Sequence, residues 1–292
     1  MIPGTFAYSL PASIPEAISL LQQYGDEAKI LAGGHSLIPM MKFRLASPAR
    51  LVDITHIAGL SDIREEGGYL HIGALTREAA LEESALIQRR YPLLSDASRV
   101  IADPLVRNMA TVCGNVAHAD PANDHPAAML ALDASIVAVG PNGERVIPVT
   151  EFFVGSFETA LGPAELLTEI RIPIPPERSG GAYVKLERKV GDYAIVAVAA
   201  QIDLAADGTV ARAGVGLTNV GETAIKASRA EAALVGTAPN ADAFKAAAAL
   251  AAAAADPASD LRGPAEYKRD MVRVLTMRAL NRALDRATNA AS

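Results

Sequence analysis

The sequence predicts an α+β protein in which two small α/β units precede a third unit of strands followed by helices. Residues 13–54 alternate between helix and strand patterns, as in a parallel β-α-β unit. Residues 60–172 mix hairpin patterns with helices. The stretch 173–181 then holds three prolines and two glycines, which is typical of a boundary between domains. We therefore expect units at residues 1–55, 56–176 and 177–292.

The N-terminal unit has clear start signals for its first helix. Ser13 is a favourable N-cap residue, Pro15 is tolerated in a first turn, and Glu16 follows the cap by three residues, as in a capping box. A second, shorter helix is expected to turn Met40, Met41 and Phe43 toward a core. The expected elements are an edge strand at 2–10, a helix at 13–24, a strand at 29–31, a helix at 37–43 and a strand at 50–54.

The middle unit is expected to hold a long irregular segment between regular elements. Residues 101–126 show neither helical nor strand periodicity, and such segments inside compact domains are usually functional. Asn123 or Asp124 can cap the helix that follows, with Pro126 in its first turn. The other expected elements are strands at 63–65 and 69–72, a helix opened by Thr76, a helix at 92–102 stopped by Pro104, and strands at 135–139, 144–148 and 166–172.

The C-terminal unit is expected to consist of three strands and then three helices. The run GVGLTNVG at 214–221 superficially resembles a dinucleotide fingerprint, but its third glycine is misplaced, and we assign its first residues to a strand. The expected elements are strands at 182–187, 194–204 and 211–218, a helix from Ser228, an alanine-rich helix at 241–255, and a helix with apolar spacing from Tyr267 to Leu284.

Composition restricts the class of function. The net charge is −6 and the basic residues are scattered, so nucleic-acid binding is not expected. No apolar run approaches the roughly 20 residues of a membrane span, and the N-terminus lacks the pattern of a signal peptide. The single cysteine, Cys113, excludes an intrachain disulfide and any all-thiolate metal site within the chain. We expect a cytoplasmic protein without a metal site of its own.

The stretch AGGHS at 32–36 has the features of a phosphate site. An apolar strand leads into two glycines, which permit positive φ and close approach of a ligand. Ser36, a good N-cap type, then opens a short helix whose free N–H groups favour an anion. Taken alone, two glycines are equally consistent with a tight turn between strand and helix that binds nothing.

A second glycine-centred loop, TVCGN at 111–115, gives the first one a context. Together the two loops resemble the paired flavin-binding motifs of the FAD-binding medium subunits of molybdenum hydroxylases, which are related to the flavin domain of xanthine dehydrogenase. The resemblance covers essentially the whole chain, and within the group it favours the carbon monoxide dehydrogenase branch. The stretches that carry it are AGGHSLIPMMKFRLASP, IADPLVRNMATVCGN, AHADPANDHPA and DLRGPAEYK.

The resemblance implies a fold and a set of FAD contacts. The fold is that of the molybdenum hydroxylase flavoproteins: two α/β subdomains that grip FAD, and a C-terminal domain of a three-stranded antiparallel sheet with helices. The first loop would wrap the pyrophosphate, and the second would donate hydrogen bonds to phosphate or ribitol. Asp124 would hold the ribose of adenosine, Tyr193 would lie near the isoalloxazine, and Leu167 and Lys185 would lie on the ring's rim. The implied FAD-binding residues are Ala32, Gly33, Gly34, His35, Ser36, Ile101, Ala102, Thr111, Val112, Cys113, Gly114, Asn115, Asp124, Leu167, Lys185 and Tyr193.

The resemblance also implies a function without a catalytic residue on this chain. FAD would take electrons from the 2Fe–2S clusters of a small partner subunit and pass them to an external acceptor such as quinone. A large subunit with the molybdenum cofactor would oxidise carbon monoxide, in a dimer of heterotrimers that is cytoplasmic or peripheral to the inner face of the membrane. One alternative is the flavin subunit of a related hydroxylase acting on an aldehyde or N-heterocycle. A second is a nucleotide-binding protein without redox function.

Some residues carry competing interpretations. The family usually has a second glycine where this chain has Cys113, so we predict negative φ there and normal FAD affinity. The residues His118, Asp120, Asp124 and His125 could form a metal site, but no spacing places them on one face, and we prefer capping and hydrogen bonding as their explanation. Tyr193 alone could be an ordinary rim tyrosine. The basic cluster 185–189 is expected to be a solvated face, with a docking surface as the alternative.

Overall fold

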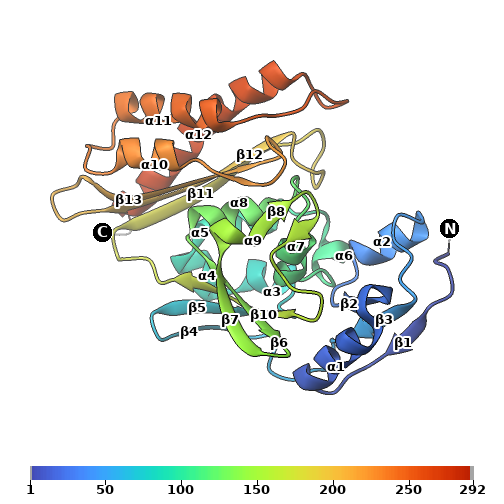
Figure 1. Ribbon diagram of the computed structural model, residues 1–292. Helices are drawn as coiled ribbons and strands as arrows, with labels where there is room; N and C mark the ends of the chain where they lie inside the picture. The colour runs from blue at the N-terminus through green and yellow to red at the C-terminus, as the bar shows by residue number, and fades with distance from the viewer. Residues whose placement is uncertain (1, 290–292) are drawn as a thin grey trace.

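The computed structural model of the chain describes residues 2–289, in three main sheets, a two-stranded ribbon and flanking helices (Figure 1). The N-terminal unit lies to one side, and the C-terminal helices cover the sheet farthest from it. In the described part of the chain, no helix is long and apolar enough to cross a membrane. The expectation of an α+β fold is confirmed.

The N-terminal unit is the predicted parallel β-α-β unit. Its three parallel strands lie in the order β1-β3-β2, with β1 at an edge. The capping box forms: Ser13 Oγ accepts from the N–H of Glu16 at 3.4 Å, and Glu16 Oε2 accepts from the N–H of Ala12 at 2.8 Å. The elements are β1 (Ala7–Ser9), α1 (Ile14–Tyr24), a 3-10 turn (Gly25–Glu27), β2 (Ala28–Leu31), α2 (Leu37–Lys42) and β3 (Arg50–Asp53).

Two expectations about the short helix α2 are wrong. Ser36 stands at its N-cap position but has αR backbone angles, and its side chain makes no capping hydrogen bond. Phe43, expected to face a core, is 66% exposed, whereas Met41 is buried. A helix of six residues has too few turns for its sequence to settle which side faces inward.

The middle unit is built on a five-stranded antiparallel sheet in the order β4-β5-β10-β6-β7. The strands are β4 (Ile63–Glu66), β5 (Tyr69–Gly73), β6 (Ser135–Gly140), β7 (Gly143–Pro148) and β10 (Leu166–Pro173), and β8 (Phe153–Gly155) with β9 (Glu158–Thr159) forms a separate ribbon. The helices are α3 (Glu78–Glu83), α4 (Ala85–Arg90), α5 (Pro92–Arg99), α6 (Pro104–Arg107), α7 (Val112–His118), α8 (Asp124–Ala131) and α9 (Val149–Phe152).

The segment expected to be irregular contains two short helices, α6 and α7. Asp103 caps α6 by accepting from the N–H of Val106 at 3.0 Å, and Thr111 caps α7 by accepting from the N–H of Gly114 at 3.1 Å. Pro104, expected to stop a helix, starts one. Helices of four and seven residues are too short to establish a period, so only their caps could have revealed them.

The C-terminal unit has the predicted strands and helices, with one additional short strand. They are β11 (Ser179–Leu186), β12 (Val196–Leu204), β13 (Val210–Thr218), β14 (Ile225–Lys226), α10 (Ser228–Leu234), α11 (Ala241–Ala254) and α12 (Ala265–Asn289). Helices α10 and α12 lie on one face of the antiparallel sheet, with α11 packed against these two helices, and α5 and α8 of the middle unit pack on the other face (Figure 1). Every residue of β12 is therefore buried.

The glycines of the GVG run have a packing function. A Cβ atom on Gly214 would collide with the backbone of Ala131, and one on Gly216 with the backbone of Ala127. Strand β13 therefore lies directly against helix α8. This contact joins the middle and C-terminal units. This contact fixes the N-terminal end of α8, where Asp124 stands.

Candidate functional site

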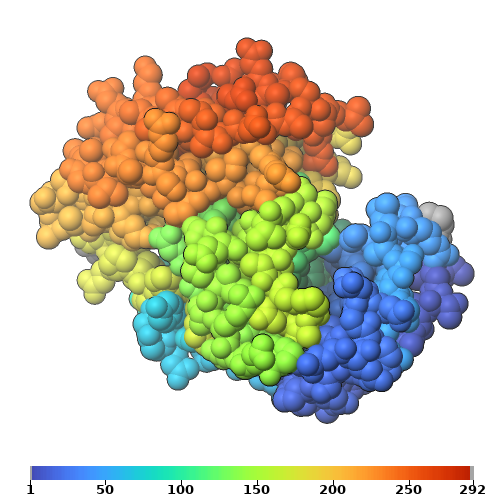
Figure 2. All heavy atoms as spheres, in the orientation of Figure 1, coloured from blue at the N-terminus to red at the C-terminus, as the bar shows by residue number. Residues whose placement is uncertain are grey.

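A cleft of about 730 Å³ is lined by residues of the N-terminal, middle and C-terminal units. Figure 2 shows the N-terminal unit, in blue, set off to one side of the other two. The volume falls in the upper part of the range for small-molecule and cofactor sites. The predicted residues that line it are Ala32, Gly33, Gly34, His35, Ser36, Ile101, Ala102, Thr111, Gly114, Asn115, Asp124, Lys185 and Tyr193.

The first glycine loop follows β2 and presents free backbone donors. Within residues 2–289, no group accepts a hydrogen bond from the backbone N–H of any residue from Gly33 to Leu37. Gly34 has φ +74°, a conformation that other residues rarely adopt. His35 Nδ1 lies 3.0 Å from the carbonyl oxygen of Gly33, a contact that holds the loop's shape. A run of unpaired N–H groups at a helix start is suited to an anion.

The second glycine loop touches the first. A Cβ atom on Gly33 would lie 2.5 Å from the carbonyl oxygen of Met109 and 2.9 Å from the nitrogen of Thr111. Only a glycine therefore allows the two backbones to approach this closely. Asn115 follows in the same loop, and its Oδ1 is buried without a hydrogen-bond partner in the described part of the chain. A buried oxygen of this kind normally accepts a hydrogen bond, which a ligand or a water molecule can donate here.

Val112 and Cys113 do not line the cleft, contrary to expectation. Both are buried in the core beneath the first turn of α7, because the helix directs them toward the sheet. The predicted negative φ at Cys113 is confirmed, since it lies in a helix and is not among the described residues with positive φ. Its Sγ lies 3.5 Å from the carbonyl oxygens of Ile72 and Gly73, and burial raises the pKa of the thiol. The thiol is thus poorly placed for redox chemistry.

Replacing this cysteine gives a first test of the second loop. Cys113→Gly should leave the affinity for flavin and the flavin spectrum unchanged, because the side chain points away from the cleft. It should lower the free energy of unfolding by about 1–3 kcal/mol, through a small cavity and a glycine within a helix. Flavin titration and urea unfolding measure the two effects. A large gain in flavin affinity would contradict this description of the loop.

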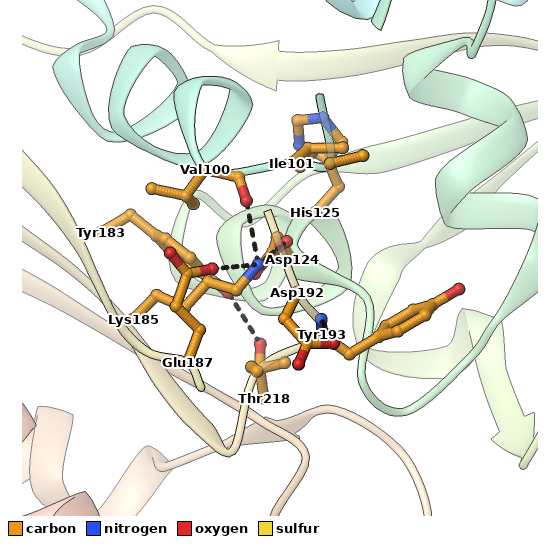
Figure 3. Close-up of polar contacts among 12 residues, drawn as sticks. Val100, Ile101, Asp124, His125, Tyr183, Lys185, Glu187, Asp192, Tyr193 and Thr218 are labelled. Atoms are coloured by element: carbon orange, nitrogen blue, oxygen red, sulfur yellow. Dashed lines mark hydrogen bonds and ion pairs between the residues drawn. The ribbon is translucent and has the colours of Figure 1, made fainter. Parts of the chain in front are cut away.

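Asp124 and Lys185 form a buried ion pair in the wall of the cleft (Figure 3). Lys185 Nζ lies 2.8 Å from Asp124 Oδ2 and donates to the carbonyl oxygen of Val100 at 3.0 Å. The hydroxyl of Tyr183 donates to Asp124 Oδ1 at 2.7 Å. Burial raises the pKa of Asp124, and the hydrogen bonds from Lys185 and Tyr183 oppose that rise.

This pair leaves one expectation open and corrects another. Asp124 is expected to accept hydrogen bonds from a ribose, and each of its oxygens already accepts one from the protein. A carboxylate oxygen has a second lone pair, so a further bond to a ligand is compatible with this geometry. Lys185 was expected on a solvated basic face, but its side chain is only 2% exposed. The ion pair explains why a lysine is buried here.

Ala102, Gly191 and Tyr193 also line the cleft. Ala102 has φ +46°, and a Cβ atom on Gly191 would lie 2.5 Å from its carbonyl oxygen. Tyr193 is 48% exposed, and the Arg262 guanidinium lies 5.9 Å from its ring centroid. The backbone of Tyr193 also accepts a hydrogen bond from Arg262 at 2.6 Å. The ring therefore lies at the rim of the cleft on a loop held by the C-terminal unit.

Leu167 is not part of the cleft. It lies in β10 opposite Ala138, is buried in the core, and is 5% exposed. Residues 161–163 and Glu165, just before this strand, line the cleft instead. The loop that enters β10 reaches the cleft, whereas the strand itself is covered on both faces.

Several lining residues were missed. Phe157 has φ +60°, and its ring lies against that of His118 with centroids 5.1 Å apart. The sequence does not indicate the positive φ of Phe157. It also does not indicate that this ring contacts His118, which lies 39 positions earlier in the chain. In the described chain, no three His, Cys, Asp or Glu side chains gather as a potential metal site. His125 instead pairs with Glu78 at 2.7 Å, with both side chains fully buried.

Comparisons with known proteins agree with this geometry. Residues 4–175 match a family described as the FAD binding domain in molybdopterin dehydrogenase, and residues 181–283 match the CO dehydrogenase flavoprotein C-terminal domain. The chain is 48% identical to the carbon monoxide dehydrogenase medium chain of Afipia carboxidovorans, over 99% of this chain and 100% of that one. It is 40% identical to the 6-hydroxypseudooxynicotine dehydrogenase complex subunit alpha of Paenarthrobacter nicotinovorans, over 98% and 97% of the two chains.

A solved structure gives the same result for the fold. It is that of carbon monoxide dehydrogenase from Hydrogenophaga pseudoflava, lacking the Mo-pyranopterin moiety of the molybdenum cofactor. The matching chain is 49% identical, with a TM-score of 0.95 over 98% of this chain and 99% of that one. The chain therefore belongs to the family of FAD-binding molybdopterin dehydrogenase flavoproteins that includes the carbon monoxide dehydrogenase medium chains, and it is a subunit of an oxidoreductase.

Proposed function

We propose that the cleft between the two glycine loops holds FAD, with the donors of residues 33–37 on its diphosphate. The single observation that carries this proposal is the contact of Gly33 with the backbone of residues 109–111, which brings two loops from separate units to one cleft. The unpaired N–H groups supply donors for an anion. The buried Oδ1 of Asn115 supplies an acceptor for a hydroxyl, such as those of ribitol. Bound FAD would store two electrons and exchange them singly.

The role of the chain's own residues is to bind and orient the flavin. The aliphatic side chain of Ile101 and the ring of Tyr193 offer apolar surface on the wall of the cleft. The Asp124–Lys185 pair places two fixed, opposite charges in the same wall. Fixed charges and excluded water near a flavin set its potential. Val112, Cys113 and Leu167 are left out of this assignment because they do not line the cleft.

We further propose that the chain is the electron-transfer subunit of an aerobic carbon monoxide dehydrogenase. Its partners would be a large molybdenum subunit, which oxidises carbon monoxide, and a small subunit with 2Fe–2S clusters that feed electrons to FAD. A single, buried cysteine supports this division of labour, because a cluster needs several thiolates. Quinone is the proposed external acceptor, and a dimer of heterotrimers is the proposed assembly. One thiol suits a reducing compartment, so we place the complex in the cytoplasm.

One alternative has support from the comparisons. A relative at 40% identity is named as a subunit of a 6-hydroxypseudooxynicotine dehydrogenase complex, so a chain similar to this one belongs to a complex named for an organic substrate. The substrate is chosen on the large subunit. Turnover of the purified complex with carbon monoxide, compared with an aldehyde and an N-heterocycle, separates the alternatives. Activity only with an organic substrate would overturn the assignment to carbon monoxide.

Removal of the flavin tests the binding function itself. The purified complex should be yellow, lose its flavin on acid treatment, and regain the spectrum with FAD but not with FMN. FMN lacks the second phosphate and the adenosine, so it cannot satisfy both loops. The flavin-to-protein ratio and the absorption spectrum are the measurements. A complex that is colourless and stays so with FAD would favour a nucleotide-binding protein without redox function.

A further inference from the structure

Tyr183 lies behind the wall of the cleft rather than in it. It stands on β11 two residues before Lys185, so both side chains leave the same face of the strand and reach the N-terminal end of α8 (Figure 3). The ring of Tyr183 is 3% exposed. Its hydroxyl lies 2.7 Å from Asp124 Oδ1 and 3.3 Å from Thr218 Oγ1. Tyr183 therefore touches the ion pair without reaching the space in front of it.

The contacts form a chain from the C-terminal sheet to the cleft. Thr218 on β13 is fully buried beside the Tyr183 hydroxyl, which donates to Asp124. Asp124 Oδ2 in turn accepts from the ammonium of Lys185, a residue of the cleft lining. Among the described residues, Tyr183 and Lys185 donate the hydrogen bonds that the Asp124 carboxylate accepts. Removing a hydrogen bond to a buried charged group therefore leaves that group unsatisfied.

We propose that Tyr183 is a positioning residue of the flavin site: its hydroxyl fixes the Asp124 carboxylate, which holds the Lys185 ammonium at the wall where FAD binds. This inference rests on the proposed function, and it goes beyond it by adding a residue that lies outside the cleft. It also gives the C-terminal unit a defined role, because Tyr183 and Thr218 both belong to that unit's sheet.

The proposal predicts a specific dependence on pH. Without the Tyr183 hydroxyl, burial raises the pKa of Asp124 further, so the carboxylate takes up a proton at higher pH than in the unmodified chain. Once Asp124 is neutral, Lys185 loses its nearer counter-charge, at 2.8 Å, and keeps only the more distant carboxylate of Glu187, at 3.7 Å. The charged and titratable groups facing this pair are Glu187, just after β11, Tyr193 in the loop that follows, and the buried His125–Glu78 pair. None of them donates a hydrogen bond to Asp124 among the described residues, so none replaces Tyr183.

The test is Tyr183→Phe in the purified complex, stripped of flavin and titrated with FAD. The Kd for FAD should rise by about tenfold or more, the effect of one hydrogen bond to a charged group. The rise should grow as the pH falls, and the flavin reduction potential should shift. The matched control is Tyr91→Phe: this tyrosine is 2% exposed and donates to Glu65 at 2.7 Å, away from the cleft. Its Kd and pH profile should be unchanged.

Two further variants separate positioning from a general loss of packing. Thr218→Val removes the other partner of the tyrosine hydroxyl and should give a smaller rise in Kd with the same pH trend. In an Asp124→Asn background, Tyr183→Phe should change Kd by less than about twofold, because its effect passes through the carboxylate. Equal Kd values and pH profiles for Tyr183→Phe and the unmodified complex would overturn the proposal. An unmodified complex that binds no FAD would instead overturn the proposed function.

Discussion

Gly34→Val should abolish retention of FAD while the rest of the protein stays folded. Gly34 has φ +74°, and a Cβ atom there would lie 2.8 Å from Ile38 Cδ1 and 3.3 Å from Leu31 Cδ1. A β-branched residue strongly disfavours this conformation, so the loop must move. The backbone N–H groups of the loop would then no longer converge on one anion. We expect the affinity for FAD to fall by about 100-fold or more, as when several charge-assisted hydrogen bonds are lost together.

The matched control is Gly208→Val, in the turn between β12 and β13. Gly208 has φ +87°, and nothing lies within 4 Å of a Cβ atom added there. This variant carries the same backbone strain but is far from the cleft lining. It should keep its full flavin content, measured as the ratio of flavin to protein after purification. If Gly34→Val also kept its flavin, the first loop would not be the diphosphate site.

Lys185→Met should lower the free energy of unfolding more than any other single change proposed for this chain. It leaves the Asp124 carboxylate buried without its ionic partner, and breaking a buried pair in this way costs about 3–5 kcal/mol. The loss should be smaller at about pH 5 than at about pH 8. Burial raises the pKa of Asp124 in the folded state. The charged carboxylate therefore lowers the stability of the folded protein, and this loss grows as the pH rises above the pKa that Asp124 has in the unfolded chain. Urea unfolding at the two pH values measures the difference.

Lys268→Met is the control for this change. The Lys268 side chain is equally buried, at 3% exposed, but its partner Asp260 is 44% exposed and keeps its contact with water. The loss of stability should therefore be smaller and nearly independent of pH in this range. If Lys185→Met and Lys268→Met destabilised the protein equally at both pH values, the Asp124 charge would not be the cause.

Elements with local signals could be predicted from the sequence. Ser13, Pro15 and Glu16 mark the start of α1 because capping depends on a few neighbouring residues. The hairpin around Asn142 and Gly143 follows from turn chemistry in the same way. The three long strands of the C-terminal unit follow from strand patterns, and their antiparallel pairing was implied by the family resemblance. The two-residue strand β14 is too short to predict. The division at residues 55 and 176 stays a prediction about domains.

Features that depend on distant parts of the chain could not be predicted. Phe43 is exposed and Leu167 is buried in the core because of which elements pack on them, and neither residue type decides this alone. Gly33 has a local reason to lie in a turn, but its contact with residues 109–111 appears only in three dimensions. The same holds for Tyr183, which is 59 residues from Asp124 in sequence. The family resemblance predicted most of the residues that line the cleft. The structure shows which residues contact them, such as Tyr183 beside Asp124.

The most direct test of the account is a crystal structure of the complex with FAD bound. It should show the diphosphate within hydrogen-bonding distance of the backbone nitrogens of residues 33–37, with the loop at 111–115 on its other side. The Asp124–Lys185 pair should be intact and within reach of the cofactor. A flavin bound at another surface of this chain, or this cleft filled by protein side chains, would contradict it.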